Sequence, residues 1–430
     1  MDQNNFNPET CSLDELKARI DELENTEEFY NTMQLATKIF INSVYGVFGT
    51  AFFNLADSDI AESITLQGQD LIKFSVNEIN KYINEHWNTD YEGHKRIADR
   101  LKDIFGDAFD YDGFIYRAKS NLLKISSLQA YGDTDSAYIT LQPLIDACNI
   151  PLEQQLEFDL AFYDEILASY MDEKFDNYAN VYHCKNNLEK FELEKISRTI
   201  IMLAKKNYMC DVQWIDSGAR FDPLEHITYT GFDVVKGTTT DYCREEMKNF
   251  VSYVFSVLNS GRKPTLGEIV IKLKDIKKRF ILQNPNDISI TKSISNYENF
   301  VFDDKSKEIQ YYEFKMDEDE NGNKVMTNKK LPVPIHVRAA AVYNNMLFNK
   351  AKKYKSKYSF LKSGDKVKYY HIDQDKVFGF VPDMFPLEFA PPIDIDTQFE
   401  KMLLSPLNRI VSALGYDEIP PTLAYTPGLF

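Results

Sequence analysis

Helical repeats alternate with β-hairpin signals along this chain of 430 residues, and that alternation limits its possible architectures. Residues 12–30 carry apolar side chains at helical spacing, and Ser12 followed by Glu15 fits a capping box at the helix start. A second helix is predicted over about residues 27–48, where no proline interrupts the pattern. The apolar stripe from Ile60 to Ile83 predicts a further helix that packs on a core.

Extended segments follow these helices. The Gly-Asp-Thr-Asp run at residues 132–135 lies between two short extended runs, and Asn-Gly at 321–322 supports a turn in an exposed hairpin. Two strand-like runs and another helix are predicted over residues 199–212, 227–235 and 241–258. Because the helices alternate with hairpins and not in regular βαβ units, the sequence predicts an α+β fold.

The charge balance excludes one broad class of nucleic-acid-binding protein. Lysine and arginine total 49 against 66 aspartate and glutamate, a formal net charge of −17. Such a chain does not bind nucleic acid by being basic all over, although a local basic groove stays open. No apolar run reaches the roughly 18–20 residues of a membrane helix, and the N-terminus lacks a signal-peptide pattern. Five cysteines without a CxxC pair indicate reduced thiols, so we expect an intracellular, cytoplasmic protein without a membrane segment.

One face of the predicted second helix combines a cation, an amide and an aromatic ring. At about 100° per residue, Lys38, Asn42 and Tyr45 fall on the same side of the helix. The ammonium group suits a triphosphate and the ring suits a base or sugar, while Gly46 leaves room for another chain to approach. For any single residue, the alternative is a solvated lysine beside a buried tyrosine. The pattern as a whole favours a face that binds a nucleoside triphosphate.

Two aspartates stand at the tip of the predicted hairpin. Asp133 and Asp135 are two positions apart on extended backbone, so their side chains point to the same side. Two adjacent carboxylates repel each other unless a cation offsets their charge, and magnesium is the natural partner. Paired metal ions of this kind clamp the attacking and leaving oxygens of a phosphoryl transfer. On this segment alone, a turn whose carboxylates cap backbone amides explains the pattern better.

Taken together, the two segments resemble motifs of family B DNA polymerases, in the order of that family. Residues 38–46 resemble the fingers-helix motif B, and residues 131–136 resemble the palm motif C. Downstream, residues 205–208 (Lys-Lys-Asn-Tyr) resemble a Lys-Lys-Arg-Tyr segment that lies along the primer–template minor groove. Residues 233–240 and 336–344 resemble thumb segments, most like those of the replicative polymerases of large tailed phages.

The resemblance implies a right-hand polymerase architecture. Residues 1–50 would be a helical remnant of the fingers, and residues 51–231 a palm with an antiparallel sheet plus helices. Residues 232–430 would be a mainly helical thumb with the C-terminal tail. The polar segment 88–120, rich in aspartate and glycine, is expected to be an insertion or small subdomain of the palm.

The resemblance also implies a role for each matching residue. Asp135 would bridge two catalytic magnesium ions, and Asp133 would lie beside them as a weaker or indirect ligand. Lys38 would hold the triphosphate of a dNTP, Asn42 would support the same face, and Tyr45 would lie under the nascent base pair. Phosphate contacts position a duplex without reading its sequence, as a template copier requires. The expected contacts with primer–template DNA are Lys205, Lys206, Tyr208, Lys236 and Arg338.

Several parts of the family pattern are absent from this sequence. No motif A, an aspartate followed by Ser-Leu-Tyr-Pro-Ser, precedes Lys38, and a two-metal site without that carboxylate has too little charge to hold both ions. Residues 159–163 are superficially similar but have helical spacing, which predicts a surface helix. Asn207 stands where the family has a basic residue. We therefore expect the C-terminal half of a split replicative polymerase, completed by an N-terminal polypeptide that carries motif A and the exonuclease. A truncated polymerase fragment is the alternative.

In so acidic a chain, contacts with DNA should be concentrated in basic clusters. Three clusters lie at residues 185–206, 262–279 and 350–368. For the last two, a solvated helix or hairpin face explains the charges equally well. The chain ends in Leu429 and Phe430 after a proline and a glycine, which resembles the terminus that docks on the sliding clamp in the phage polymerases. Folding back onto the thumb is the alternative for this tail.

Two functions of other classes remain open. A catalytically silent DNA-binding or scaffold protein derived from a polymerase would keep the shape without the chemistry. A nuclease could use Asp133 and Asp135, although the face of Lys38 has no place in that reaction. The intact pairing of both segments favours a magnesium-dependent DNA polymerase acting inside an infected bacterial host.

Overall fold

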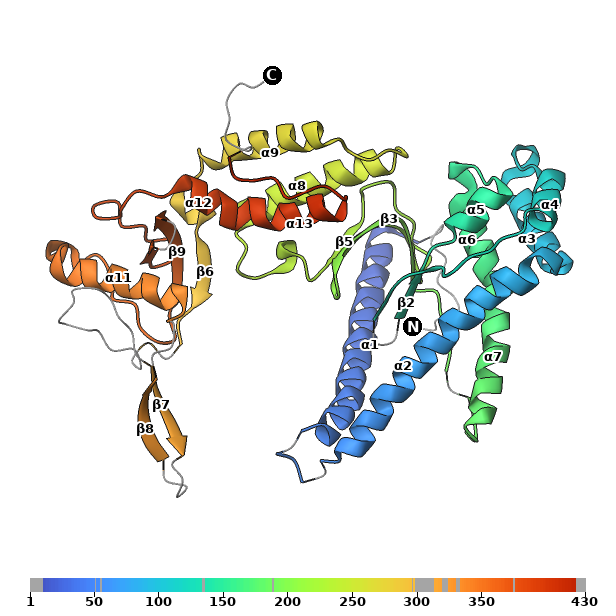
Figure 1. The fold of residues 1–430 in the computed structure, drawn as a ribbon, viewed down its shortest axis with the longest axis horizontal. Coiled ribbons are helices and arrows are strands. Elements are labelled where there is room, and N and C mark those ends of the chain that lie inside the picture. Colours follow the sequence, from blue (N-terminus) through green and yellow to red (C-terminus); the bar gives the residue numbers. More distant parts are fainter. Residues whose placement is uncertain are drawn as a thin grey trace. The chain divides into compact units, whose positions relative to one another are not determined.

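The computed structural model divides the chain into two compact units, Met1–Phe191 and Glu192–Phe430. Both units combine helices with antiparallel strands, which confirms the predicted α+β class (Figure 1). The boundary between them lies inside the expected palm. The residues described are 11–50, 52–54, 56–133, 136–187, 189–295, 297, 313–318, 324–329, 333–373 and 376–422, with the backbone alone at 313–318 and 324–329. Within these ranges, no helix is both long enough and apolar enough to cross a membrane.

The first unit begins with one helix of 36 residues, α1 (Leu13–Phe48). The predicted division into two helices is wrong, because neither proline nor glycine interrupts the segment between them. The capping box is confirmed, since Ser12 Oγ accepts from Glu15 N at 3.3 Å and Glu15 Oε2 accepts from Ser12 N at 2.9 Å. None of the residues of α1 is buried.

The stripe from Ile60 to Ile83 forms α2 (Ser58–Lys81) and continues into the π-turn η1 (Tyr82–His86). Figure 1 shows α1 and α2 joined at their consecutive ends and diverging from there. The C-terminal half of the stripe packs as predicted, because Ile79 and Ile83 are buried in the core of this unit. Its N-terminal half, beside α1, leaves Ile60 and Ile64 exposed.

The segment 88–120 is mostly helical and supplies part of the core. Its helices bury Ile97, Leu101 and Phe114 completely. The aspartates and glycines that suggested a polar insertion begin these helices, since Asp90 and Asp110 each cap the helix that follows. The elements are η2 (Trp87–Thr89), α3 (Tyr91–Phe105), η3 (Gly106–Ala108) and α4 (Tyr111–Ser120).

A β-hairpin and a long bent helix complete the first unit. The predicted hairpin is confirmed as an antiparallel pair, and the helical pattern after it is confirmed as a helix with a π-turn in its middle. The bounds are β1 (Gln129–Asp133), β2 (Ser136–Ile139), α5 (Gln142–Cys148), η4 (Leu152–Gln154), α6 (Gln155–Phe162), η5 (Tyr163–Leu167) and α7 (Ala168–Val181).

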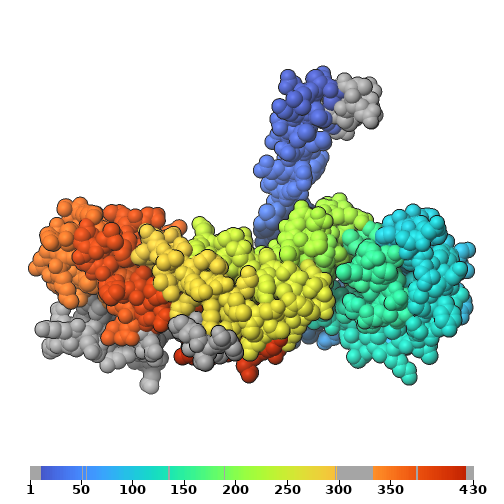
Figure 2. Space-filling model, turned by 90° about the horizontal axis from the view of Figure 1, so that it is seen from above, coloured from blue at the N-terminus to red at the C-terminus, as the bar shows by residue number. Residues whose placement is uncertain are grey.

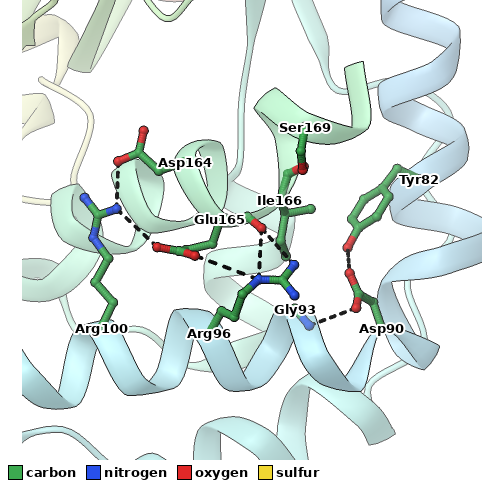
Figure 3. Close-up of polar contacts among 9 residues, drawn as sticks. All are labelled: Tyr82, Asp90, Gly93, Arg96, Arg100, Asp164, Glu165, Ile166 and Ser169. Carbon is green, nitrogen blue, oxygen red and sulfur yellow. Dashed lines mark hydrogen bonds and ion pairs between the residues drawn. The ribbon is translucent and has the colours of Figure 1, made fainter. Parts of the chain in front are cut away.

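Two arginines of α3 fasten it to this bent helix (Figure 3). Arg100 Nη1 lies 2.7 Å from Asp164 Oδ2, and Arg96 donates two hydrogen bonds to the backbone carbonyl of Glu165, at 2.8 and 3.2 Å. The guanidinium groups therefore satisfy polar groups at the π-turn while the apolar faces of the same helices close the core.

The helix at residues 159–163 is present, but its prediction as a surface helix is wrong. Phe158 and Phe162 are fully buried on either side of Asp159. The Oδ1 atom of Asp159 is buried without a hydrogen-bond partner, and burial raises the pKa of this carboxyl to about 7. The helical spacing predicts the helix correctly. The charge of Asp159 suggests a surface position, but the residues around it are apolar and buried.

Replacing Asp159 with asparagine should remove a pH dependence of stability. The folded state keeps the proton up to a pH of about 7, whereas the unfolded carboxyl releases it near pH 4. The folded chain therefore binds more protons between these values, and its stability falls as the pH rises through that window. Between pH 5 and pH 7 we expect the free energy of unfolding of the wild type to fall by about 2 kcal/mol more than that of Asp159→Asn. Urea unfolding at the two pH values measures this difference. Asp164→Asn, at a solvent-accessible ion pair, should leave the wild-type pH profile unchanged; equal profiles for all three proteins would contradict the expectation.

The second unit is built on a three-stranded antiparallel sheet in the order β3-β4-β5. The helices that follow bury a large apolar cluster against it, including Phe250, Phe255 and Phe280. The predicted helix over 241–258 is confirmed. The bounds are β3 (Lys195–Ala204), β4 (Asn207–Ile215), β5 (Ile227–Thr230), η6 (Asp233–Val235), α8 (Asp241–Leu258), α9 (Leu266–Phe280), α10 (Pro285–Ile288), α12 (Ile395–Phe399), η9 (Glu400–Leu404) and α13 (Ser405–Ala413).

A second sheet in this unit has the order β10-β9-β6 and packs against α11. A separate hairpin forms in the charged segment, as predicted, although Asn321 and Gly322 lie outside the described residues. The bounds are β6 (Ile290–Ser293), β7 (Glu313–Glu318), β8 (Lys324–Lys329), α11 (Ile335–Asn349), η8 (Lys352–Tyr354), β9 (Lys366–Asp373) and β10 (Lys376–Phe380).

Candidate nucleotide and nucleic-acid site

Asn80 of α2 and Asn84 of η1 bind the segment that leads into the Gly-Asp-Thr-Asp hairpin. Asn80 Oδ1 accepts from Leu128 N at 2.8 Å. Asn84 exchanges two hydrogen bonds with the backbone of Ile125, at 2.8 and 2.9 Å. A side-chain amide that satisfies both polar groups of one residue replaces a missing strand partner. The start of β1 is thereby fixed relative to α2.

Asp133 is the last residue of β1 and lies opposite Ser136 in the hairpin. Its side chain is half-buried. Two residues before it, Tyr131 pairs with Tyr138 across the strands, with ring centroids 5.7 Å apart. Thr134 and Asp135 lie outside the described residues, so the shared orientation of the two carboxylates stays a prediction.

The donor chemistry of this hairpin suits magnesium, but one described carboxylate does not make a two-metal site. Carboxylate oxygens are the ligands that magnesium prefers, and Asp133 provides them. In the part of the chain that the structure describes, no three histidine, cysteine, aspartate or glutamate residues are grouped to hold a metal ion. Further carboxylates would have to join Asp133 to hold two divalent ions.

The predicted triphosphate face lies on α1, towards its C-terminal end, and is open. Lys38, Asn42 and Tyr45 are all exposed, so the alternative of a buried tyrosine does not hold. The Tyr45 hydroxyl hydrogen-bonds Thr65 Oγ1 of α2 at 2.9 Å. Lys38 and Asn42 have no side-chain hydrogen bond or ion pair with any residue that the structure describes. A Cβ on Gly46 would meet no atom within 4 Å, so another chain has room to approach.

Both candidate segments form hydrogen bonds with α2, but at different positions along its axis. Tyr45 contacts Thr65, whereas the approach to β1 is fixed at Asn80. These two α2 positions are 15 residues apart, or about 22 Å along the helix axis. No described contact joins Lys38 to Asp133, and their convergence on one nucleotide stays a prediction.

The second unit brings two of the predicted DNA-binding segments to one end of its first sheet. Lys205 and Lys206 form the exposed turn between β3 and β4, and Tyr208 pairs with Thr230 of β5. Gly231, with φ +65°, lies so close to this turn that a Cβ there would overlap the carbonyl oxygen of Lys206. The turn and the segment after β5 are therefore packed backbone to backbone.

A charged cluster follows directly after β5. The Nζ of Lys236 lies 2.9 Å from Asp233 Oδ1, and Arg409 of α13 binds the other oxygen of the same carboxylate. Arg409 also lies over the ring of Phe232, 5.3 Å from its centroid. One carboxylate shared by two cations leaves this cluster with a net positive charge. No local pattern in the sequence identifies Arg409, because its partner is distant along the chain.

The last predicted DNA contact, Arg338, lies elsewhere. It belongs to α11, which packs on β9 and β10, and its Nε atom is buried without a hydrogen-bond partner. No described contact joins Arg338 to the β3–β4 turn. The predicted clamp contacts Leu429 and Phe430 lie outside the described residues.

The basic cluster at residues 262–279 is largely neutralised within the protein. Arg262 and Arg279 each bind both oxygens of a glutamate, at 2.6–3.0 Å, and the Nζ of Lys277 lies 2.7 Å from Asp396 Oδ1. Arg262 lowers the pKa of Glu268 to about 2. Bidentate guanidinium–carboxylate pairs are structural links. These contacts favour the structural interpretation of this cluster over direct binding of DNA.

Comparisons with known proteins agree with the motifs. Residues 14–150 match the family described as "DNA polymerase family B". The DNA polymerase of Choristoneura biennis entomopoxvirus is 24% identical over 298 residues, which cover 66% of this chain and 24% of that protein. The DNA-directed DNA polymerase of Enterobacteria phage T4 is 23% identical over 248 residues, covering 55% of this chain and 24% of that protein.

The corresponding enzyme of Escherichia phage RB69 is 26% identical over 165 residues, covering 38% of this chain and 14% of that protein. The chain thus spans about a quarter or less of the length of these relatives. The family match includes both Lys38–Gly46 and the β1–β2 hairpin. The comparisons therefore support a relationship to the family B DNA polymerases, at low sequence identity.

Proposed function

We propose that this chain is the C-terminal part of a replicative DNA polymerase that adds dNTPs to a primer 3′ end on a template. The observation that carries the proposal is the occurrence of both motifs, in family order, inside the segment that matches family B. In this assignment the first unit contributes part of the fingers and the palm. The second unit completes the palm with β3–β5 and then forms the thumb.

In the proposed reaction, Asp133 and Asp135 would hold magnesium ions together with the carboxylate of motif A. The ions would supply charge stabilisation to the attacking and leaving oxygens. Lys38 neutralises the triphosphate, Asn42 supports the same polar face, and Tyr45 supports the nascent base pair while its hydroxyl is held by Thr65. Catalysis of this type rests on positioning and electrostatics more than on covalent chemistry.

The duplex would lie along the end of the β3–β4–β5 sheet. Lys205 and Lys206 lie in the exposed turn at this end of the sheet, Tyr208 lies in β4, and Lys236 follows β5. Arg338 would reach the DNA backbone from the thumb. Such contacts to phosphates bind any sequence equally, as copying a template demands.

An N-terminal polypeptide that supplies motif A and the exonuclease would complete the enzyme. The surface of α1 supports this part of the proposal, since many of its apolar side chains are exposed and no residue of the helix, dark blue in Figure 2, is buried. A large number of exposed apolar side chains on one element indicates a surface that another polypeptide covers. The exposed apolar side chains of α1 from Phe29 onwards include Phe29, Tyr30, Met33, Leu35, Ile39, Phe40, Ile41 and Val44.

Primer extension tests this proposal. The isolated chain should extend a labelled primer negligibly, because its metal site lacks the carboxylate of motif A. Addition of the polypeptide that carries motif A should restore magnesium-dependent extension by at least about a thousandfold, the scale of a lost catalytic group. Extension is measured on a gel with and without magnesium.

Robust synthesis by the isolated chain would refute the need for an N-terminal polypeptide. Absence of synthesis by a purified stoichiometric complex would favour the second candidate, a catalytically silent DNA-binding protein derived from a polymerase.

Two further features belong to the same proposal. Leu429 and Phe430 would dock on a sliding clamp and make synthesis processive. The enzyme would act in the cytoplasm of an infected bacterial host, since two of its relatives are polymerases of bacteriophages.

A further inference from the structure

The end of α11 and the turn after it place exposed lysines around exposed phenylalanines. Phe348 and Phe360 are 55% and 44% exposed. The Nζ of Lys355 lies between them, 4.1 Å from the centroid of Phe348 and 5.8 Å from that of Phe360. Lys352 and Lys353 are exposed beside them, and we name these five residues the lysine–phenylalanine surface.

The backbone beneath this surface is firmly held. The side chains of Leu347, Ala351, Tyr358 and Leu361 are buried in the core between α11 and its sheet. Asn344 binds the backbone of Leu361 through both atoms of its amide, at 2.8 and 2.9 Å. The lysines and phenylalanines are therefore presented on a fixed support, and their exposure is a property of the folded chain.

The charge of this region contrasts with the rest of the molecule. Residues 350–368 contain eight lysines and one acid, Asp365, a net charge of +7 in a chain of −17. Lys357 is neutralised by Glu388, whose Oε1 lies 2.5 Å from its Nζ. Over the ranges that the structure describes, Lys352, Lys353 and Lys355 form no ion pair. This is the opposite of the cluster at residues 262–279, where carboxylates bind most of the cations.

We propose that the lysine–phenylalanine surface binds a single-stranded segment of nucleic acid. Ammonium groups neutralise phosphates, and exposed rings provide faces on which unpaired bases stack. In a duplex the bases are already stacked on each other, so they offer no free face for stacking on Phe348 or Phe360. A patch that served only duplex phosphates would need the lysines alone. The combination of both residue types favours a single strand.

Fluorescence anisotropy tests the proposal with labelled oligothymidylate of about 15 nucleotides and a blunt duplex, using the full chain without dNTP or any partner. Phe348→Ala and Phe360→Ala should each weaken binding of oligothymidylate by roughly tenfold and leave binding of the duplex unchanged. The triple variant Lys352→Gln, Lys353→Gln, Lys355→Gln should lower the slope of log affinity against log salt by about 2.

Matched controls are available at exposed positions outside the surface. The triple variant Lys95→Gln, Lys278→Gln, Lys401→Gln changes the net charge equally, and Leu282→Ala removes an exposed apolar side chain. Both should bind oligothymidylate as the wild type does. Unchanged binding by the phenylalanine variants, or equal losses in the control triple, would overturn the proposal. The assay needs no DNA synthesis, so its failure is distinct from failure of the polymerase proposal.

Discussion

Asp135→Asn, in the complex of this chain with the polypeptide that carries motif A, should abolish DNA synthesis and spare binding of primer–template DNA. The substitution keeps the size of the side chain but removes the negative charge that would bridge two magnesium ions. Loss of about 4 kcal/mol of transition-state stabilisation corresponds to a thousandfold slower incorporation. Single-turnover incorporation measures the chemistry, and anisotropy with a labelled duplex measures binding.

Two matched variants make this result specific. Asp133→Asn should cost less, roughly 10–100-fold, because Asp133 is expected to be the weaker or indirect ligand. Asp146→Asn removes an exposed carboxylate from α5 in the same unit and should leave incorporation unchanged. If Asp135→Asn retained the wild-type rate, the assignment of the catalytic metal site to this hairpin would be wrong. If it abolished binding of the duplex as well, the variant would report a structural defect.

Local signals predicted several elements well. The capping box at Ser12 marks the true start of α1, and the β1–β2 hairpin and α8 lie where periodicity and turn residues place them. These signals succeed because each depends on residues within a few positions of one another. The same holds for the exposed face of Lys38, Asn42 and Tyr45, whose common side follows from helix geometry alone.

Tertiary context decided the features that the sequence did not reveal. The charge of Asp159 predicts a surface position, yet its neighbours Phe158 and Phe162 are buried, so this helix packs in the core. The aspartates of segment 88–120 suggest a polar, exposed segment, but Asp90 and Asp110 cap helices whose apolar side chains are buried. The pairing of Arg409 with Asp233 joins segments that no periodic pattern connects. In each case the outcome depends on packing between distant segments, which a local pattern does not encode.

The family resemblance and the structure inform different parts of the candidate site. The motifs identify which residues to examine, and the structure places Asp133, Lys38 and Lys206 on a strand end, a helix face and a turn.

Gly231→Ala should both destabilise the second unit and weaken binding of primer–template DNA. Gly231 has φ +65°, which costs an alanine about 1 kcal/mol. The new Cβ would also overlap the carbonyl oxygen of Lys206, so the backbone of the β3–β4 turn must move. We expect a total loss of about 2–4 kcal/mol in urea unfolding. Affinity for a labelled duplex should fall with it, because Lys205 and Lys206 lie on the displaced turn.

Gly218→Ala separates the two causes. Gly218 also has a left-handed backbone, with φ +82°, but a Cβ there would meet no atom within 4 Å. Its replacement should therefore cost only the backbone share, about 1 kcal/mol, and leave affinity for the duplex unchanged. Equal losses of stability in the two variants would show that the close packing of Gly231 on Lys206 is unimportant. Unchanged binding of the duplex by a folded Gly231→Ala protein would remove the β3–β4 turn from the proposed DNA contact.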